Sequence, residues 1–536
     1  MFTRRELLAS AGVAGLAGLA ARPVQALSLK QLYYQSVVPE IFRDIPRPPT
    51  YTPNLVIGSG FGGAVSALRL AQAGQQVAVL ERGSKWPMDS HRSIFSNDTL
   101  PDGRAFWHRT SAKMIAGITT YFDDFGGVLD TTVYDNMIVW RGAAVGGGSV
   151  VFTGVMIQPE RRYFDAIFNG LVNYDEMNNI FYPRVRQMLR LSPMPAKIYN
   201  SMPHGHSRLW DQQVAKAGYK SYPVESIWNW NVVQAELSGT SKPSATIGLS
   251  NHGNSNGAKY DLNQNYLLQA EATGRAKIYP GHEVQGIGWD GSRYTVDVIK
   301  RSPDGQQLDR YVLSCDRLFL AAGSIGTSEL LVRAQAQGTL HNLNAETGHG
   351  WGSNGDTIVV RSFGIPKGFV QSAPCASRIH DPSGLPVSLQ NWYVPGVPVD
   401  VGIIGSLGMG FDQTHRGRFL YDASVNKVRL EWAVGGNDDV IAATGLVNNR
   451  ICAAAQVVPG AWPFVEGVNG RSWTAHPLGG AVLGKVTDAY GRVKGHAGLY
   501  VMDGAMIPGS TGTVNPSLTI TALAERNIQN IVQKGG

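Results

Sequence analysis

Two stretches near the C-terminus carry side chains able to hold or accept a proton. "TAHPLGGAV", Thr474 to Val482, contains His476 in front of a proline, with two glycines close behind. Histidine can act as a base near neutral pH, but a lone histidine is more often structural. "NPSLTITALAERN" begins with Asn515, which precedes a proline and has an equally plain interpretation as the cap of a helix. Whether either residue does chemistry depends on the elements that hold them.

A third stretch, "NLVIGSGFGGAVSALRLAQAGQQVAVLERG" from Asn54 to Gly83, has the pattern of a dinucleotide site. It predicts in order a strand, three spaced glycines, a helix, a second strand and an acid: 55–57; Gly58, Gly60 and Gly63; 64–72; 77–80; Glu81. The glycines permit a tight turn and close approach to a pyrophosphate, whose charge is favoured at a helix N-terminus. The acid is placed to accept hydrogen bonds from a ribose. This motif alone fits NAD as well as FAD.

Two later segments belong to the same predicted sheet. "RLFLAAGSIGTSELLVRA", Arg317 to Ala334, predicts a strand over 318–321, a turn over 322–324 and a helix from about Thr327. Residues 499–503 repeat the order of strand and acid. One long insertion separates the Asn54–Gly83 unit from Arg317, and a second lies between Ala334 and residue 499; the second contains alternating stretches such as "RFLYDA" that predict strands. The expected fold is therefore α/β, with a Rossmann-like nucleotide-binding domain and a discontinuous, mixed-sheet substrate-binding domain.

The expected boundaries divide the chain into seven segments. The nucleotide-binding domain takes 54–158, 257–350 and 471–536, and the substrate domain takes 159–256 and 351–470. Residues 27–53 form a proline-rich lead-in that ends where the first strand begins.

Residues 1–26 have the pattern of an export signal. "TRRELLASAGVAGLAGLAARPVQA" combines a twin arginine, a weakly apolar stretch and an A-x-A-like cleavage site at its end. The alternative is a membrane anchor, but the apolar stretch over 7–21 is too short and too rich in glycine to span a bilayer. We therefore expect twin-arginine export to the periplasm or beyond, after the protein has folded around its cofactor.

The net charge and the cysteine spacing bear on two possible ligands, nucleic acid and metal ions. The formal charge of +7 is a mild excess without the basic runs that nucleic-acid binding needs. Cys315, Cys375 and Cys452 have no metal-ligand spacing, so we expect neither a nucleic-acid partner nor a metal.

The motifs together resemble one enzyme family. Besides the Asn54–Gly83 unit they include "RGAAVGGGSVV" (Arg141 to Val151), "HPLGGAVLGKVTDAYGRVKG" (His476 to Gly495) and the stretch from Asn515. The chain is similar in these motifs to the glucose-methanol-choline (GMC) oxidoreductases, and within them to the flavin-containing bacterial cholesterol oxidases. The resemblance implies FAD, bound without a covalent link because no histidine lies in or just after the loop over 146–149.

The resemblance also assigns site residues. His476 would take or orient the proton of a substrate hydroxyl, and Asn515 would hydrogen-bond the same hydroxyl. The residues expected to line the cofactor are Gly58, Gly60, Phe61, Gly62, Gly63, Glu81, Gly147, Phe152, Val284, Gly323, Asp503, Gly504, Asn515 and Pro516.

One position departs from the cholesterol oxidases. These enzymes carry a glutamate that moves the steroid double bond, and Gln390 stands at the matching place. No Asp or Glu occurs from Pro382 through Val399, so a shift of several residues would not restore a carboxylate. An amide cannot shuttle that proton. The sequence therefore predicts oxidation without efficient isomerisation.

The leading hypothesis is an alcohol oxidase for a sterol-like or other bulky apolar alcohol, with oxygen as acceptor and hydrogen peroxide as product. Such a substrate implies transient contact with a membrane surface. The alternatives are a dehydrogenase of the same superfamily with a quinone or protein acceptor, and a flavin- or lipid-binding protein without turnover. The oligomeric state is left open.

Overall fold

The structure is a computed structural model, and it describes residues 29–44, 46–113, 119–362, 370–395, 400–460 and 472–534. The predicted export signal over 1–26 lies outside the described residues. Within these ranges, every helix is too short or too polar to span a bilayer.

The first large sheet has seven strands and carries the predicted nucleotide motif. Its strands are β1 (Tyr51–Ile57), β2 (Val77–Leu80), β8 (Ala276–Tyr279), β9 (His282–Trp289), β10 (Tyr294–Arg301), β11 (Gln307–Leu320) and β21 (Leu499–Val501). The order is β8-β2-β1-β11-β10-β9, with β21 also paired to β11. Strand β11 joins two halves, because one part pairs antiparallel with β10 and its last residues pair parallel with β1 and β21.

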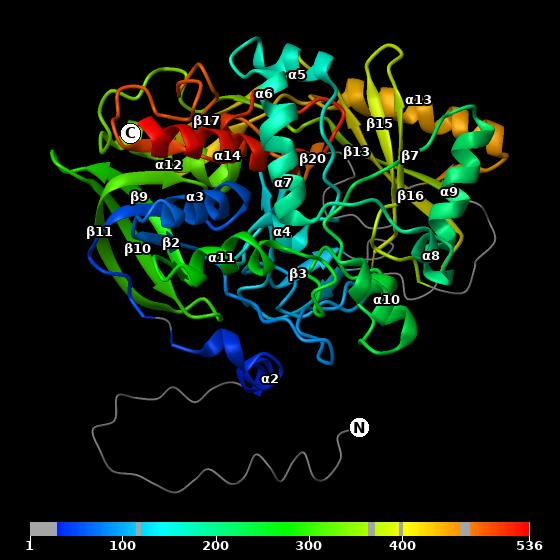
Figure 1. The fold of residues 1–536 in the computed structure, drawn as a ribbon, viewed down its shortest axis with the longest axis horizontal. Helices are drawn as coiled ribbons and strands as arrows, with labels where there is room; N and C mark the ends of the chain where they lie inside the picture. Colours follow the sequence, from blue (N-terminus) through cyan, green and yellow to red (C-terminus); the bar gives the residue numbers. More distant parts are fainter. Residues whose placement is uncertain are drawn as a thin grey trace, which may run out of the picture.

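Helices cover this sheet and complete its core. Those beside it are α3 (Phe61–Gln72), α11 (Tyr266–Ala272), α12 (Gly323–Gln337) and α14 (Ser517–Lys534). Helices α11 and α14 both pack on α3, so the last helix of the chain lies beside the first helix of the nucleotide motif (Figure 1). The largest apolar cluster of the described residues is built from these strands and helices.

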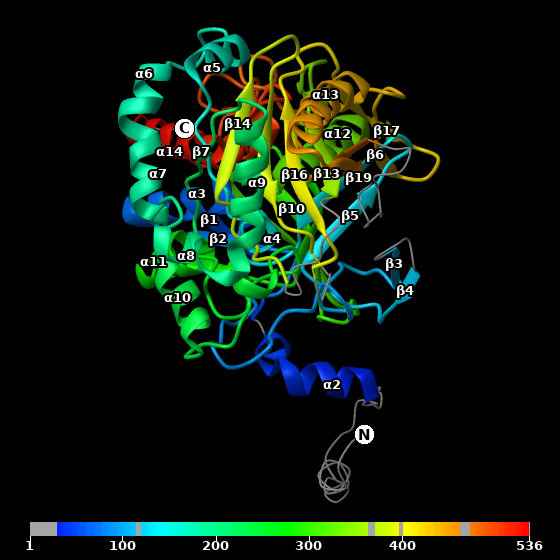
Figure 2. The same ribbon diagram turned by 90° about the vertical axis from the view of Figure 1, so that its right-hand side faces the viewer.

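The second large sheet is antiparallel throughout. Its order is β19-β13-β16-β15-β14-β7, formed by β7 (Tyr222–Pro223), β13 (Asp356–Ser362), β14 (Ser377–Asp381), β15 (Val387–Trp392), β16 (Ile403–Gly410) and β19 (Val458–Gly460). Helices α9 (Gly205–Lys216) and α13 (Asp438–Ala455) pack on each other and on this sheet (Figure 2). Strands of the two insertions thus share one sheet.

Three small sheets complete the strands. They are β20 (Ser472–Thr474), β6 (Met137–Gly142) and β5 (Leu129–Val133); β12 (His349–Trp351), β17 (Gly417–Asp422) and β18 (Lys427–Glu431); and β3 (Ser111–Lys113) with β4 (Thr119–Tyr121). The remaining α-helices are α2 (Leu29–Val37), α4 (Gly148–Val151), α5 (Arg161–Phe168), α6 (Tyr174–Glu176), α7 (Tyr182–Leu189), α8 (Ala196–Tyr199) and α10 (Trp230–Ser238). The predicted α/β fold is confirmed, with a Rossmann-like sheet that carries the nucleotide motif and a second sheet built from both insertions.

Several predicted element boundaries are wrong by a few residues. Strand β1 begins at Tyr51, so Pro53 lies inside it rather than before it. This is tolerated because β2 pairs with β1 only from Asn54 onward. Helix α12 begins at Gly323, four residues before the predicted start, since that glycine takes a φ of 77° and turns the chain directly into the helix. Helix α3 likewise begins at Phe61, directly after Gly60.

Candidate active site

A cavity of about 460 Å³ runs from the end of strand β1 to the start of helix α14. Most of the residues expected at the cofactor line it: Gly58, Gly60, Phe61, Gly62, Glu81, Gly147, Phe152, Val284, Gly323, Asp503, Gly504, Asn515 and Pro516. His476 lines it as well. Two predicted site residues, Gly63 and Gln390, are not among the lining residues.

The end of the cavity lined by Gly58, Gly60, Gly62 and Glu81 is called the nucleotide end below, and backbone segments approach one another closely there. A Cβ atom on Gly58 would lie 2.2 Å from the carbonyl oxygen of Ala321, and one on Gly62 would lie 1.8 Å from the carbonyl oxygen of Met502. A Cβ on Gly63 would meet the carbonyl oxygen of Gly58 at 2.0 Å, so Gly63 serves the helix turn itself. The N-terminus of α3 therefore opens onto the cavity, where its free N–H groups suit a pyrophosphate.

Glu81, the residue after strand β2, is a buried acid at this end. Its carboxylate accepts hydrogen bonds from the N–H (3.1 Å) and hydroxyl (2.7 Å) of Ser59 and from the N–H of Gly83 (3.0 Å). Burial raises the pKa of the Glu81 carboxyl above its ordinary value. A carboxylate has about four acceptor positions, so one remains for a ribose hydroxyl on the cavity side. The geometry fits the predicted role.

Asp503 ties the end of strand β21 to helix α12. Its carboxylate accepts from the N–H of Gly323 (2.8 Å), the hydroxyl of Thr327 (2.6 Å) and the N–H of Ala505 (2.8 Å). Burial raises the pKa of Asp503 to about 6. The acid thus shapes the wall between the two βα units, and Gly504 next to it reaches the cavity.

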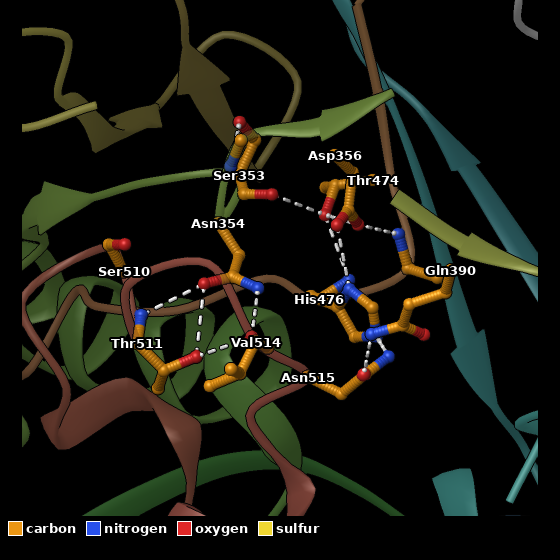
Figure 3. A network of polar contacts seen from close by, with 12 residues as sticks. Ser353, Asn354, Asp356, Gln390, Thr474, His476, Ser510, Thr511, Val514 and Asn515 are labelled. Carbon is orange, nitrogen blue, oxygen red and sulfur yellow. Dashed lines mark hydrogen bonds and ion pairs between the residues drawn. The ribbon is translucent and has the colours of Figure 1, made fainter. Parts of the chain in front are cut away.

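At the opposite end, His476 and Asn515 lie side by side (Figure 3). The Nδ2 atom of Asn515 is 3.4 Å from Nε2 of His476. The other ring nitrogen, Nδ1, lies 2.7 Å from Oδ1 of Asp356, the first residue of β13. Three segments distant in the sequence therefore meet here: the start of β13, the chain after β20, and the chain before α14.

The structure separates the two interpretations of Asn515. Its side chain bonds to His476 and to Gln390, whose Nε2 donates to Oδ1 of Asn515 at 2.5 Å. Among the described residues, no helix N–H is bonded to the Asn515 side chain, and the first turn of α14 is instead closed onto the carbonyl of Pro516. A role limited to helix capping is therefore wrong. Gln390, buried on β15, supports Asn515 from behind.

Sequence reasoning missed several residues of this site. Asp356 is the last residue of "GHGWGSNGD" (Gly348 to Asp356), and nothing in this local pattern indicates a contact with His476. Trp140, Trp392 and Trp473 line the cavity together with Leu407. Strands β6 and β20 pair side by side, and the rings of Trp140 and Trp473 meet edge to face with centroids 5.3 Å apart. Strands β6 and β20 are too short for an alternating pattern to predict that their tryptophans line a cavity.

The sequence matches one family over most of this architecture. Residues 119–343 and 423–524 match the two parts of the GMC oxidoreductase family, and residues 54–94 match an FAD binding domain. The chain belongs to the GMC oxidoreductase family. FAD is accordingly its cofactor, and the close-packed glycines and Glu81 at the nucleotide end fit that cofactor.

Relatives within the family include cholesterol oxidases. One from Acinetobacter baumannii is 25% identical, and the match covers 90% of this chain and 94% of the relative. Another, from Mycobacterium tuberculosis, is 26% identical over 88% of this chain and 89% of the relative.

Solved structures share the fold at lower identity. Pyridoxine 4-oxidase from Mesorbium loti superposes with a TM-score of 0.61 at 16% identity, over 89% of this chain and 99% of the other. A fungal aryl-alcohol oxidase gives a TM-score of 0.59 at 14% identity, over 91% of this chain and 100% of the other.

Proposed function

We propose that this FAD oxidoreductase oxidises a secondary alcohol of a sterol-like or other bulky apolar substrate, with oxygen as the final acceptor and hydrogen peroxide as product. The observation that carries the proposal is the pair of His476 and Asn515 at the cavity wall, opposite the nucleotide end. An acceptor nitrogen and an amide donor side by side are the two groups that a substrate hydroxyl needs.

The chemistry of the pair follows from their hydrogen-bonding capacities. Nε2 of His476 accepts the hydroxyl proton, and the amide of Asn515 holds the hydroxyl oxygen in place. When bound, FAD supplies the acceptor for the hydride that leaves the alcohol carbon. The glycines and Glu81 hold the nucleotide half, without a covalent link, because the loop over 146–149 offers no histidine.

The wall near His476 favours an apolar substrate. Trp140, Trp392, Trp473 and Leu407 present rings and an aliphatic side chain to the cavity. Such a surface binds large hydrophobic bodies and leaves orientation to a few polar groups. Ala475, with a small side chain, also lines the cavity. The named cholesterol oxidases among the relatives support a sterol as the first alcohol to test.

Isomerisation of a steroid is not expected. Gln390 has an amide that donates to Asn515 and cannot carry a proton between two carbons. Asp356, which contacts His476, has a side chain with 0% exposure and does not line the cavity. We therefore expect the 3-ketone to form with its double bond in the original place.

The test is an anaerobic reduction of the FAD-loaded protein lacking residues 1–26. We expect cholesterol to bleach the visible flavin band, and air to restore it with one peroxide per turnover. The ultraviolet band of a conjugated enone should not develop. Flavin that cholesterol and bulky aromatic alcohols all leave oxidised would contradict an alcohol as substrate. Reoxidation by a quinone or dye but not by oxygen would instead identify the dehydrogenase alternative.

We also propose that residues 1–26 direct twin-arginine export of the folded, FAD-loaded protein. The support is the twin arginine followed by a weakly apolar stretch and a small-residue cleavage site. Replacing Arg4 and Arg5 together with lysine should retain the protein in the cytoplasm. Export at the wild-type level after that change would refute it.

A further inference from the structure

His476 and Asn515 mark what we call the hydroxyl end of the cavity, because the substrate hydroxyl is proposed to bind there. Asp356 lies behind His476 at this end, and its side chain is 0% exposed and contacts groups of residues 474–476. Oδ1 lies 2.7 Å from Nδ1 of His476. Oδ2 accepts from the hydroxyl of Thr474 at 2.8 Å and from the N–H of Ala475 at 2.9 Å. Among the described residues, no lysine or arginine forms an ion pair with it. The carboxylate is therefore held by groups that flank His476 on the chain, and its one ring contact is with that histidine.

The contact decides which ring nitrogen carries hydrogen. An ionised carboxylate only accepts hydrogen bonds, so the nitrogen facing Asp356 must donate. In a neutral imidazole the other nitrogen, Nε2, is then the acceptor. Nε2 is the nitrogen beside Asn515, at the cavity.

A second, independent set of contacts gives the same answer. Nε2 of Gln390 donates to Oδ1 of Asn515 at 2.5 Å, which fixes the orientation of the Asn515 amide. Its Nδ2 group, a donor, must then face Nε2 of His476. A hydrogen on Nε2 would oppose this donor. With the two amides oriented in this way, the network also places hydrogen on Nδ1 and a lone pair on Nε2 (Figure 3).

We propose that Asp356 is the positioning residue that keeps His476 in this tautomer and orientation, so that Nε2 always meets the substrate hydroxyl as an acceptor. The inference rests on the proposed function of His476. Asp356 does not line the cavity, so it acts on the reaction through the histidine alone. Its bonds to Thr474 and Ala475 lock the carboxylate in turn, as partners behind a reacting group do in other sites.

The direct test is nitrogen NMR of histidine-labelled, oxidised holoenzyme, which needs no substrate. Wild-type His476 should show a protonated Nδ1 and an unprotonated Nε2. In Asp356→Asn the amide can donate to Nδ1, so the opposite tautomer should become populated. The matched control is Asp412→Asn, because Asp412 also lies 2.7 Å from a histidine Nδ1, that of His415, away from the cavity. This control should leave the His476 signals unchanged.

The kinetic arm uses anaerobic flavin reduction by cholesterol, or by benzyl alcohol if cholesterol is inert. Asp356→Asn should slow reduction about 100-fold, the range expected when a base is held in the wrong protonation form, with little change in substrate affinity or FAD content. Thr474→Val removes one bond to Asp356, together with the contacts of the same hydroxyl with the His476 N–H and the Ser353 carbonyl, but it keeps the contact between the carboxylate and the ring. It should retain the wild-type tautomer and lose far less activity.

Three results would overturn the inference. These are a protonated Nε2 in the wild-type enzyme, an unchanged reduction rate in Asp356→Asn, and equal losses in Asp356→Asn and Thr474→Val, which would mean that the carboxylate serves only the fold. The wild-type spectrum decides even if the variants fail to fold. If no alcohol reduces the flavin, the proposed function fails, while the spectrum still tests the tautomer.

Discussion

The two ends of the cavity each contain a buried acid, and the two acids are held in different ways. Glu81 is bound by Ser59, 22 residues before it, and by Gly83, two residues after it. Asp356 is bound by residues about 120 positions later, including His476. Glu81 contacts backbone N–H groups and one hydroxyl, whereas Asp356 is part of a chain of side chains that continues to Asn515 and Gln390.

The difference indicates what each end contributes. The nucleotide end depends on close backbone packing, so changes there should affect FAD retention first. The hydroxyl end depends on the directions of side-chain hydrogen bonds, so changes there should affect the rate of flavin reduction while FAD stays bound. FAD retention and the rate of flavin reduction are therefore the two quantities to measure, and a variant that affects the wrong one first contradicts this comparison.

The largest effect is expected at His476. Replacing His476 with alanine removes the proposed acceptor for the hydroxyl proton, and the rate of flavin reduction should fall about 10²–10⁴-fold. FAD content should match that of the wild type, because none of the backbone at the nucleotide end changes.

Two further variants guard this result. His476→Gln keeps an amide able to donate to Asp356, so it separates loss of the base from exposure of an unpaired buried acid. His415→Ala removes a histidine that is also paired with an aspartate, outside the cavity, and should be silent. Turnover unchanged in His476→Ala would sink the assignment of this residue.

The next effect is expected at Gly62. A Cβ atom there would lie 1.8 Å from the carbonyl oxygen of Met502, so alanine must push the start of α3 away from the strand β21 end. Overpacking of this kind costs about 1–3 kcal/mol, which would raise the FAD dissociation constant roughly fivefold to 150-fold if the whole cost falls on the FAD-bound state. The measurement is the ratio of flavin to protein absorbance during FAD titration.

The matched control for Gly62 lies in helix α13. Gly445 has open space around the position of a Cβ and an ordinary helical backbone, so Gly445→Ala should leave FAD binding unchanged and stabilise the fold by about 0.5–1 kcal/mol. Equal FAD affinity in Gly62→Ala and Gly445→Ala would show that the close approach does not govern the site.

The same contrast explains which parts were predictable. The unit from β1 to Glu81 is local, so its period, its glycines and its acid predict the structure to within a few residues. The start of α12 at Gly323 was missed because a small-residue turn and a helix that begins on a glycine look alike in sequence. Asp356 was missed because it meets His476 only when strands β13 and β20 come together in the folded chain.

At the hydroxyl end, the candidate residues were identified from the family resemblance and not from local sequence patterns. It pointed to His476 and Asn515, whose isolated motifs fit a structural histidine and a helix cap equally well. It also pointed to Gln390, 125 residues from Asn515, as a position near the reaction. The side-chain directions that join these residues depend on tertiary packing, and no spacing along the chain encodes them.

The smallest effect is expected at Gln390. Gln390→Met keeps the volume but removes the donor to Asn515, leaving Oδ1 of that residue buried without its partner. One lost hydrogen bond is worth about 1 kcal/mol, so flavin reduction should slow roughly fivefold while FAD content stays constant. The Asn515 amide would also be freed to turn its oxygen toward His476, so part of the histidine should adopt the opposite tautomer in the nitrogen spectrum. If Gln390→Met instead lost as much FAD as Gly62→Ala, the side-chain network would also support the nucleotide end. The two ends of the cavity would then not be independent.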